Sequence, residues 1–143
     1  MLTAAAVVGS SSSALDLACT YAAERRAFGA AIGSFQAISH GLADSATDLD
    51  GARLLVQKAA WSLDGGLPRG RELAAMAFAF SSRTAEAATY HALHVHGGYG
   101  FMLEYDVQLH YRRSRGWPRA WGDADAGFRR AGDARYATAG EGR

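Results

Sequence analysis

The residue types best suited to chemistry gather in one stretch, HVHGGYGFMLEYD, which runs from His94 to Asp106. It places two histidines, three glycines and two acids in a chain whose composition otherwise favours helix. Such a stretch suits a turn, a metal site, or a place where a ligand or another chain approaches the main chain. Gly97 follows a long periodic segment, where a left-handed residue commonly ends a helix. One glycine suffices for that stop, so Gly98 and Gly100 indicate a tight loop or a close approach.

Pairs of histidine and acid offer a second kind of chemistry. His91 and His94 are three residues apart, and His40 and Asp44 are four apart, so each pair can share a helix face. Metal-binding bundles typically repeat Glu-x-x-His on two helices, and that motif does not occur here, so we predict no metal site. Nothing in the spacing supports an acid–base pair of His40 and Asp44 over ordinary hydrogen bonding. A dinucleotide fingerprint is excluded because the glycines do not lie between a strand and a helix.

A second cluster, YAAERRAFGAAIGSFQAISHGLAD, runs from Tyr21 to Asp44. It combines an arginine pair, a Phe-Gly pair that we interpret as a helix stop, and a Phe-Gln pair at a helix start. Arginine near a helix C-terminus interacts favourably with the helix dipole. The guanidinium of Arg25 would also suit bidentate binding of a pyrophosphate. Spacing favours the structural role and leaves the ligand role open.

The element most clearly defined by the sequence is a helix from Ser34 to Asp64. Its apolar residues recur every seven positions, with a second set three positions further on: Phe35, Leu42, Leu49, Val56 and Leu63, then Ile38, Ala52 and Ala59, with Ser45 as the polar member. Ser34 is the expected N-cap. A helix of this length spans roughly 45 Å and must pack beside others in so short a chain.

Further helices are expected on either side. The first runs from about Leu2 to Ala27 and has an apolar face of Ala5, Val8, Leu15, Ala18 and Ala22. Another begins at Leu73 and continues its stripe through Met76, Ala77, Phe80, Ala87 and Leu93. A shorter one runs from Asp123 to about Tyr136. No strand pattern competes. The sequence therefore predicts an all-α, antiparallel up-down bundle with three long helices and one or two short C-terminal helices, forming one domain over residues 1–143.

Bulk composition excludes several classes of function. The net charge is +1, which argues against nucleic-acid binding, so Arg112, Arg113 and Arg115 are expected on a solvated helix face. The single cysteine, Cys19, cannot form an internal disulfide and is expected to be a small core residue. No apolar run approaches the ~18 residues of a membrane span. We therefore expect a soluble, cytoplasmic protein with no membrane partner.

The two clusters together resemble the C-terminal helical domain of acyl-CoA dehydrogenases, the flavoproteins that desaturate acyl-CoA thioesters between the α and β carbons. The matching residues, in order, are Tyr21, Arg25, Phe28-Gly29, Ile32, Phe35-Gln36, His40, Leu42 to Asp44, Ala52-Arg53, His96 to Phe101, Glu104 to Asp106, and Arg112. They cover nearly the whole chain. The forms HGGYGF…EYDVQLHYRR and AAWSLD resemble most the actinobacterial branch that acts on unusual acyl or steroid side chains.

This resemblance implies a role for each cluster in contacting FAD that is held mainly by a neighbouring subunit. Arg25 would meet the pyrophosphate, Phe28 would pack nearby, and Gln36 would supply a polar contact. Gly97 and Gly98 would let main chain lie against the cofactor. His94 stands where the family more often has glutamine, and it can still donate a hydrogen bond, though its charge is sensitive to pH.

Two departures from the family bear on activity. The family's N-terminal helical and β domains, which share the flavin and acyl sites, are absent from these 143 residues. The glutamate that precedes Gly-Thr in many members falls on Trp121, which cannot accept a proton. The family's other position for this base would lie just ahead of Met1. Asp123 is a nearby carboxylate, but a helix-capping role is favoured for it. No catalytic residue is therefore assigned.

Two hypotheses follow from the resemblance. The chain is the FAD-contacting, oligomerising part of an acyl-CoA dehydrogenase and is inactive alone, or it is a catalytically silent assembly subunit that completes a partner's flavin site. In both hypotheses, the stripes on the three long helices present more apolar surface than the helices can bury against one another. We therefore expect a homo-oligomer, or a hetero-oligomer with an acyl-CoA dehydrogenase subunit.

Overall fold

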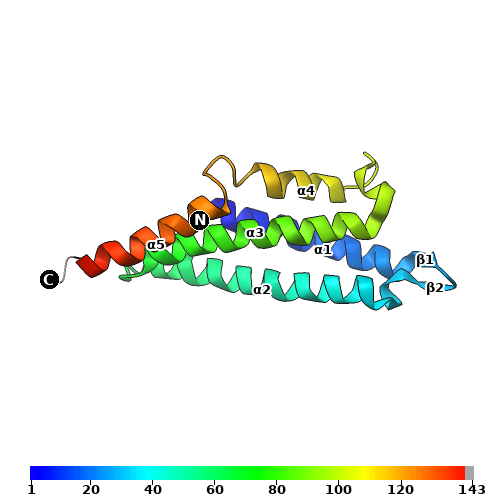
Figure 1. Cartoon of the computed structure of the whole chain (residues 1–143), viewed down its shortest axis with the longest axis horizontal. Helices are drawn as coiled ribbons and strands as arrows, with labels where there is room; N and C mark the ends of the chain where they lie inside the picture. Colours follow the sequence, from blue (N-terminus) through cyan, green and yellow to red (C-terminus); the bar gives the residue numbers. More distant parts are fainter. Residues whose placement is uncertain (141–143) are drawn as a thin grey trace.

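Long alanine-rich segments form the helices of this protein. The computed structural model describes residues 1–140, with side chains through residue 137. The helices are α1 (Leu2–Glu24), α2 (Gln36–Asp64), α3 (Gly70–His96), α4 (Val107–Gly116) and α5 (Ala124–Gly140). Figure 1 shows α1, α2 and α3 side by side in alternating directions, with α4 returning along α3 and α5 lying along the first part of α3. The predicted all-α antiparallel bundle is confirmed.

The inner face of α2 follows the predicted seven-residue pattern. Its buried members are Leu42, Ser45, Leu49, Ala52 and Ala59. Ile38 and Val56 are half-buried, and the two terminal members are exposed, Phe35 by 37% and Leu63 by 40%. The pattern therefore marks the core through the middle of α2, where α1 and α3 both pack against it.

The predicted N-cap of α2 is wrong. Residues Ile32–Ser34 form a 3₁₀ turn, η1, and the Ser34 hydroxyl donates its hydrogen bond to the carbonyl of Ala31 at 2.7 Å. The position before α2 is held by Phe35, which has an extended backbone (φ −83°, ψ 128°) and provides no side-chain cap. The N-cap of α2 is therefore one residue later than predicted.

The connection between α1 and α2 contains a small hairpin that the sequence did not predict. Strand β1 (Arg26–Ala27) pairs antiparallel with β2 (Ala30–Ala31), in the register Arg26↔Ala31 and Ala27↔Ala30. Helix α1 ends at Glu24 because Arg25 is already extended (φ −68°, ψ 126°). The expected continuation to Ala27 and the Phe-Gly helix stop are therefore both wrong, since Phe28 and Gly29 form a hairpin turn.

The buried face of α1 corrects two further expectations. Four residues are buried as predicted, namely Val8, Leu15, Ala18 and Ala22. Ala5 is exposed, and Ala4 is buried in its stead. Cys19 is exposed rather than in the core. Since successive helical residues are 100° apart, the residue after buried Ala18 turns away from α3. The serine run is helical, and the Ser12 and Ser13 hydroxyls donate to the carbonyls of Val8 and Gly9.

Helix α3 lies at the centre of the bundle and contacts every other helix (Figure 1). Its buried face is made largely of small side chains, namely Ala77, Ala79, Ala85, Ala88 and Ala92. The predicted stripe is only partly correct, because Met76 and Ala87 are exposed. Helix α5 comes especially close: a Cβ atom added at Gly127 would lie 2.8 Å from the Cβ of Ala79.

One helix among the described residues, α1, is long and apolar enough by length and composition to cross a membrane. In this fold it packs against α2, α3 and α4, and 39% of its most apolar window is buried inside the protein. A core helix has the same composition, so this feature does not by itself identify a membrane span.

Candidate functional site

The residues singled out for cofactor contact come together at one end of the bundle. Arg25 and Phe28 belong to the connection that follows α1, Gln36 begins α2, and His94 and Gly97 mark the end of α3. Figure 1 shows that α1 ends, α2 begins and α3 ends on the same side of the molecule, beside the β1–β2 hairpin. Three separate segments of the sequence therefore share one surface.

The hairpin presents Phe28 in an unusual way. Both turn residues have positive φ, 52° at Phe28 and 82° at Gly29, as in the two-residue turns that match strand twist. A positive φ is rare for a residue with a large side chain. The Arg26 guanidinium donates to the carbonyl of Gly29 at 2.9 Å and braces the turn. Phe28 is 98% exposed, so the hairpin holds an aromatic ring out from the bundle.

Arg25 lies beside this hairpin with its charged group accessible. Its backbone N–H caps α1 by donating to the carbonyl of Tyr21 at 2.8 Å. The guanidinium carbon lies 6.0 Å from the centre of the Tyr99 ring, at the outer limit of a cation–π contact. Within the part of the chain whose side chains are described, no acidic group forms an ion pair with Arg25. Its positive charge is therefore free for an anion.

A groove of about 280 Å³ runs between the first turns of α2 and the last turns of α3. It is lined by Ala37, Ile38, Gly41, Leu42, Tyr90, His91, His94 and Val95. His94 is exposed and stacks on the Tyr90 ring at 6.2 Å. His91 is instead tied to the bundle, because its Nδ1 lies 2.9 Å from the Ser45 hydroxyl. Gln36 is exposed at the start of α2 and is not one of the residues that line this groove.

The three glycines of the loop have different roles. Gly97 has φ 60° and ψ −139°, so it ends α3 with positive φ but not in the left-handed helical conformation. Gly100 is packed, since an added Cβ would lie 2.7 Å from the carbonyl oxygen of Leu93. Gly98 is open, with no neighbouring atom within 4 Å of an added Cβ. Gly97 is equally open, so Gly97 and Gly98 together leave bare main chain facing outward.

Aromatic packing behind the loop was missed in the sequence. The His96 ring is 5% exposed, bonds through Nδ1 to the carbonyl of Ala92 at 2.8 Å, and stacks on Tyr21 with ring centres 4.4 Å apart. Tyr105 packs edge-on against both rings. This cluster fixes the last turn of α3 against α1. The sequence signal for this cluster was the three-residue spacing between Leu93 and His96, which places His96 on the core face of the helix.

The position predicted for the family's glutamate lies away from this end. The loop between α4 and α5 lies on the side of the molecule where α1 begins (Figure 1). Trp121 belongs to this loop and is 66% exposed. It borders a groove of about 480 Å³ with Met1, Leu2 and Phe78. The Asp123 carboxylate accepts a hydrogen bond from the Ala126 N–H at 2.7 Å, which confirms its role as the cap of α5.

Other titratable groups do not form a reactive site. Among the described residues no group of three or more histidine, cysteine or acidic side chains is placed to hold a metal ion. Partial burial and the Asp16 carboxylate raise the pKa of the Cys19 thiol, which disfavours the thiolate. Burial and the charge of Arg113 lower the pKa of His110, whose Nδ1 lies 2.9 Å from the Ser10 hydroxyl.

Comparison with known proteins identifies the family. The family described as "Acyl-CoA dehydrogenase, C-terminal domain" matches residues 1–125. A probable acyl-CoA dehydrogenase of Bacillus subtilis is 46% identical over 112 residues, which is 78% of this chain and 29% of that protein. The human mitochondrial short-chain specific acyl-CoA dehydrogenase is 40% identical over 112 residues, 78% of this chain and 27% of that protein.

Solved structures give the same result. Butyryl-CoA dehydrogenase from Megasphaera elsdenii superposes with a TM-score of 0.88 at 34% identity, covering 94% of this chain and 35% of that one. A variant described as a steroid ACAD superposes with a TM-score of 0.91 at 28% identity, covering 96% and 38%. This chain therefore spans about a third of the length of the proteins it matches. It belongs to the acyl-CoA dehydrogenase family, an oxidoreductase family, and corresponds to that family's C-terminal domain.

Proposed function

We propose that this chain is the FAD-contacting and oligomerising domain of a cytoplasmic acyl-CoA dehydrogenase, inactive without the family's other two domains. The observation that carries the proposal is the surface at the hairpin end of the bundle. There Arg25 has no acidic partner among the described side chains, Phe28 is 98% exposed, and Gly98 leaves open main chain. A protein surface that keeps these groups uncovered suits a ligand or another chain.

The chemistry of this surface fits a flavin adenine dinucleotide. The pyrophosphate is anionic, and a guanidinium such as that of Arg25 is the side-chain group that binds phosphates bidentately. The exposed ring of Phe28 offers an apolar face for packing. Gln36, at the start of α2, and His94, which lines the groove, can donate hydrogen bonds to polar atoms of the dinucleotide. Gly97 and Gly98 allow its edge to approach the main chain.

The role of this chain in the reaction would be to hold the cofactor in position. When bound, FAD supplies the acceptor for the hydride that leaves the β carbon of an acyl-CoA thioester. Arg25 and Gln36 would hold and orient the dinucleotide, while Phe28 would exclude water beside it. No base for the α proton is assigned here, because Trp121 has no proton-accepting group and the Asp123 carboxylate caps α5.

A catalytically silent assembly subunit is the second candidate, and Trp121 favours it. A tryptophan at the glutamate position, 66% exposed in the loop before α5, leaves the hairpin surface intact but removes the family's base. To separate the two, the chain is combined with a polypeptide carrying the N-terminal helical and β domains. The enzymatic role predicts reduction of an electron acceptor with an acyl-CoA. The silent role predicts flavin retention without turnover unless the partner brings its own glutamate.

Flavin retention by that reconstituted complex tests the cofactor role. Replacement Arg25→Ala should weaken FAD binding about tenfold, as loss of a charge-assisted hydrogen bond implies. Arg71→Ala, an exposed arginine on α3 at the opposite end of the bundle, is the matched control and should leave flavin content unchanged. Flavin absorbance per subunit after gel filtration is the readout. Equal flavin loss in both variants, or in neither, would exclude the proposed contact.

The isolated chain should bind FAD weakly. A few exposed contacts at about 1.5–3 kcal/mol each barely offset the roughly 4–15 kcal/mol cost of immobilising a ligand. We therefore expect a colourless protein with a Kd for FAD no tighter than about 1 mM, measured by fluorescence titration. A yellow chain that purifies with stoichiometric FAD would contradict the incomplete site proposed here.

A further inference from the structure

The segment GGLPRGRE, residues 65–72, joins α2 to α3 and places Arg69 and Arg71 on either side of Gly70. Gly70 is buried, and a Cβ atom added to it would lie 3.1 Å from the carbonyl oxygen of Ser62 in α2. The lack of a side chain therefore lets α3 begin close against the last turns of α2. The backbone that carries the two arginines is fixed by this packing.

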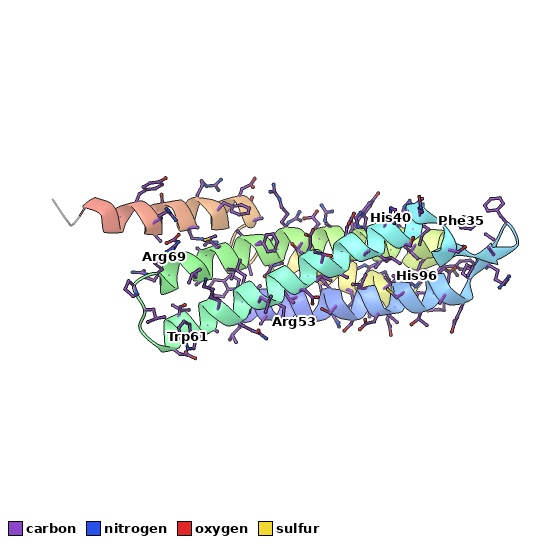
Figure 2. The ribbon with its side chains drawn as sticks, turned by 90° about the horizontal axis from the view of Figure 1, so that it is seen from below. Phe35, His40, Arg53, Trp61, Arg69 and His96 are labelled. Carbon is purple, nitrogen blue, oxygen red and sulfur yellow. The ribbon has the colours of Figure 1, made fainter. Side chains whose placement is uncertain are left out.

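The two arginines line a groove of about 610 Å³ between the first turns of α3 and the side of α5. Its other charged groups are Glu72 of α3 and Arg130 and Asp133 of α5, and alanines and one proline line the rest. We call it the arginine groove. Figure 2 shows Arg69 beside the orange-red ribbon of α5, at the end of the bundle opposite Phe35. The groove is therefore separate from the hairpin surface proposed to contact FAD.

The Glu72 carboxylate in this groove already has its partners. Only 7% of the Glu72 side chain is exposed, and its oxygens accept two hydrogen bonds from Arg69 and one from Arg135. Two guanidiniums of the same chain therefore offset its negative charge. An anion that enters the groove would meet little repulsion from this group.

Arg71 and Arg130 differ from Arg69, because neither forms an ion pair among the described side chains. The Arg130 guanidinium carbon lies 5.3 Å from the centre of the Phe78 ring, which holds this planar group at the wall of the groove. Asp133 also forms no ion pair among the described side chains. Two unpaired guanidiniums thus line the groove with one unpaired carboxylate, and the excess of positive charge favours an anion.

The arrangement of these charges favours a phosphate monoester over a carboxylate. One guanidinium fork binds a carboxylate through both oxygens, as Arg69 binds Glu72. A phosphate monoester carries a charge of about −1.5 to −2 and three acceptor oxygens, so it can accept from Arg71 and Arg130 together. Asp133 would repel a bare phosphate, but its oxygens can accept hydrogen bonds from hydroxyl groups. The groove therefore suits a phosphate attached to a hydroxylated carbon skeleton.

We propose that the arginine groove is a binding site for a sugar phosphate, with the phosphate held by Arg71 and Arg130 and a sugar hydroxyl bound to Asp133. This site goes beyond the FAD-contacting role, because none of its residues belongs to the hairpin surface. The flavin-retention experiment depends on Arg25 at the other end of the bundle. Failure of either proposal therefore leaves the other standing.

Nuclear magnetic resonance of the isotopically labelled 143-residue chain, titrated with ribose 5-phosphate in a phosphate-free buffer, tests the site. Amide signals of the first turns of α3 and of α5 should shift with a Kd below about 1 mM, while those of the hairpin stay unchanged. Ribose should cause no shift, and inorganic phosphate should bind more weakly. Absence of shifts, or shifts confined to the hairpin, would overturn the proposal.

AMP distinguishes two sources of the same chemistry, because it carries ribose 5-phosphate attached to a base. Equal binding of AMP and ribose 5-phosphate in the arginine groove would support a free sugar phosphate as the ligand. Tighter binding of AMP at the same amide signals would support a nucleotide. Binding of AMP at the hairpin alone would count against the groove.

Charge removal tests the two guanidiniums. Arg71→Gln and Arg130→Gln should each weaken ribose 5-phosphate binding at least about tenfold, as loss of a charge-assisted hydrogen bond implies. Arg129→Gln is the matched control, since it removes the same charge from the same helix outside the groove lining, and it should bind like the unmodified chain. All three arginines are exposed, so the variants should fold normally by circular dichroism. Equal weakening in all three would show an effect of net charge and exclude the site.

Asp133→Ala tests the hydroxyl contact. Loss of the carboxylate should strengthen the binding of inorganic phosphate about twofold to threefold, because a repulsive charge is gone. It should also remove the preference for ribose 5-phosphate over inorganic phosphate. Asp125→Ala, on the same helix but outside the groove lining, is the control and should keep that preference. A preference that survives in Asp133→Ala would contradict the assigned role of this carboxylate.

Discussion

At the end of the bundle where α5 packs on α3, the buried carboxylate of Glu72 accepts two hydrogen bonds from Arg69, at 2.8 and 2.9 Å, and one from Arg135, at 3.2 Å. At the opposite end, Arg25 has no acidic partner among the described side chains and Phe28 extends 98% exposed from a strained turn. At the α5 end, the Glu72 carboxylate is paired with arginines of the same chain. At the hairpin end, the Arg25 charge and the Phe28 ring remain exposed. Stability should therefore depend on the α5 end, and FAD or subunit binding on the hairpin end.

The largest expected effect on stability lies within the glycine loop, where a packed and an open position occur close together. Gly100→Ala should lower the free energy of unfolding by about 2 kcal/mol, because the new methyl group would collide with the Leu93 carbonyl 2.7 Å away. Gly98→Ala should change stability by less than about 0.5 kcal/mol, since its surroundings are open. Urea denaturation measures both. Similar losses for the two variants would show that Gly98 is also a packing residue.

The second prediction concerns Glu72 and pH. Hydrogen bonds from Arg69, supported by Arg135, lower the pKa of the Glu72 carboxyl to about 2. A carboxyl whose pKa is lowered on folding stabilises the fold above its unfolded pKa of about 4.3, and that stabilisation is lost as the pH falls toward 2. Thermal unfolding at pH 7 should show Glu72→Gln melting lower by roughly 4 °C.

Between pH 5 and pH 2 the midpoint of Glu72→Gln should also change less than that of the unmodified chain, because the titrating group is gone. Exposed Glu24→Gln is the control and should follow the unmodified profile. If the two chains lost stability in parallel on acidification, Glu72 would not be the group responsible.

A smaller effect is expected at the start of α5. Asp123→Ala removes the side-chain acceptor for the Ala126 N–H and should cost about 1 kcal/mol. Asp123→Asn keeps an oxygen acceptor and should restore most of that loss. If Asp123 instead served as a base, both variants would abolish turnover in the reconstituted complex, and Asn would rescue nothing there.

The smallest effect on stability is expected at Phe28, where function should change most. Phe28→Asn places at φ 52° a residue that tolerates positive φ, followed by Gly29, which is the favoured pair for such a turn. The isolated chain should become slightly more stable, by up to about 0.5 kcal/mol in urea denaturation, while the reconstituted complex retains less FAD. A variant that is less stable and retains flavin normally would show that the ring stabilises the fold.

The helices and their apolar faces could be predicted from sequence because the residue spacing that defines them is local. Leu42, Leu49 and Ala52 fall on one face of a helix at any tertiary arrangement, since a helix turns by 100° per residue. The bundle and the buried core of α2 follow from that spacing. The clustering of Arg25, Gln36 and His94 at one end was implied by the family resemblance, and the alternating direction of the helices produces it.

The features that could not be predicted depended on three-dimensional contacts that residue spacing does not specify. Gly98 and Gly100 are alike in sequence, and it is contact with Leu93 and His96 that makes Gly100 packed while Gly98 stays open. Cys19 and Ala18 are both small residues of α1, yet Ala18 is buried and Cys19 is exposed. The turn at Phe28 required the pairing of β1 with β2. The sequence by itself determined the helices and their apolar faces through local periodicity, whereas the tertiary structure decided which exposed groups remain available, because exposure depends on what packs nearby.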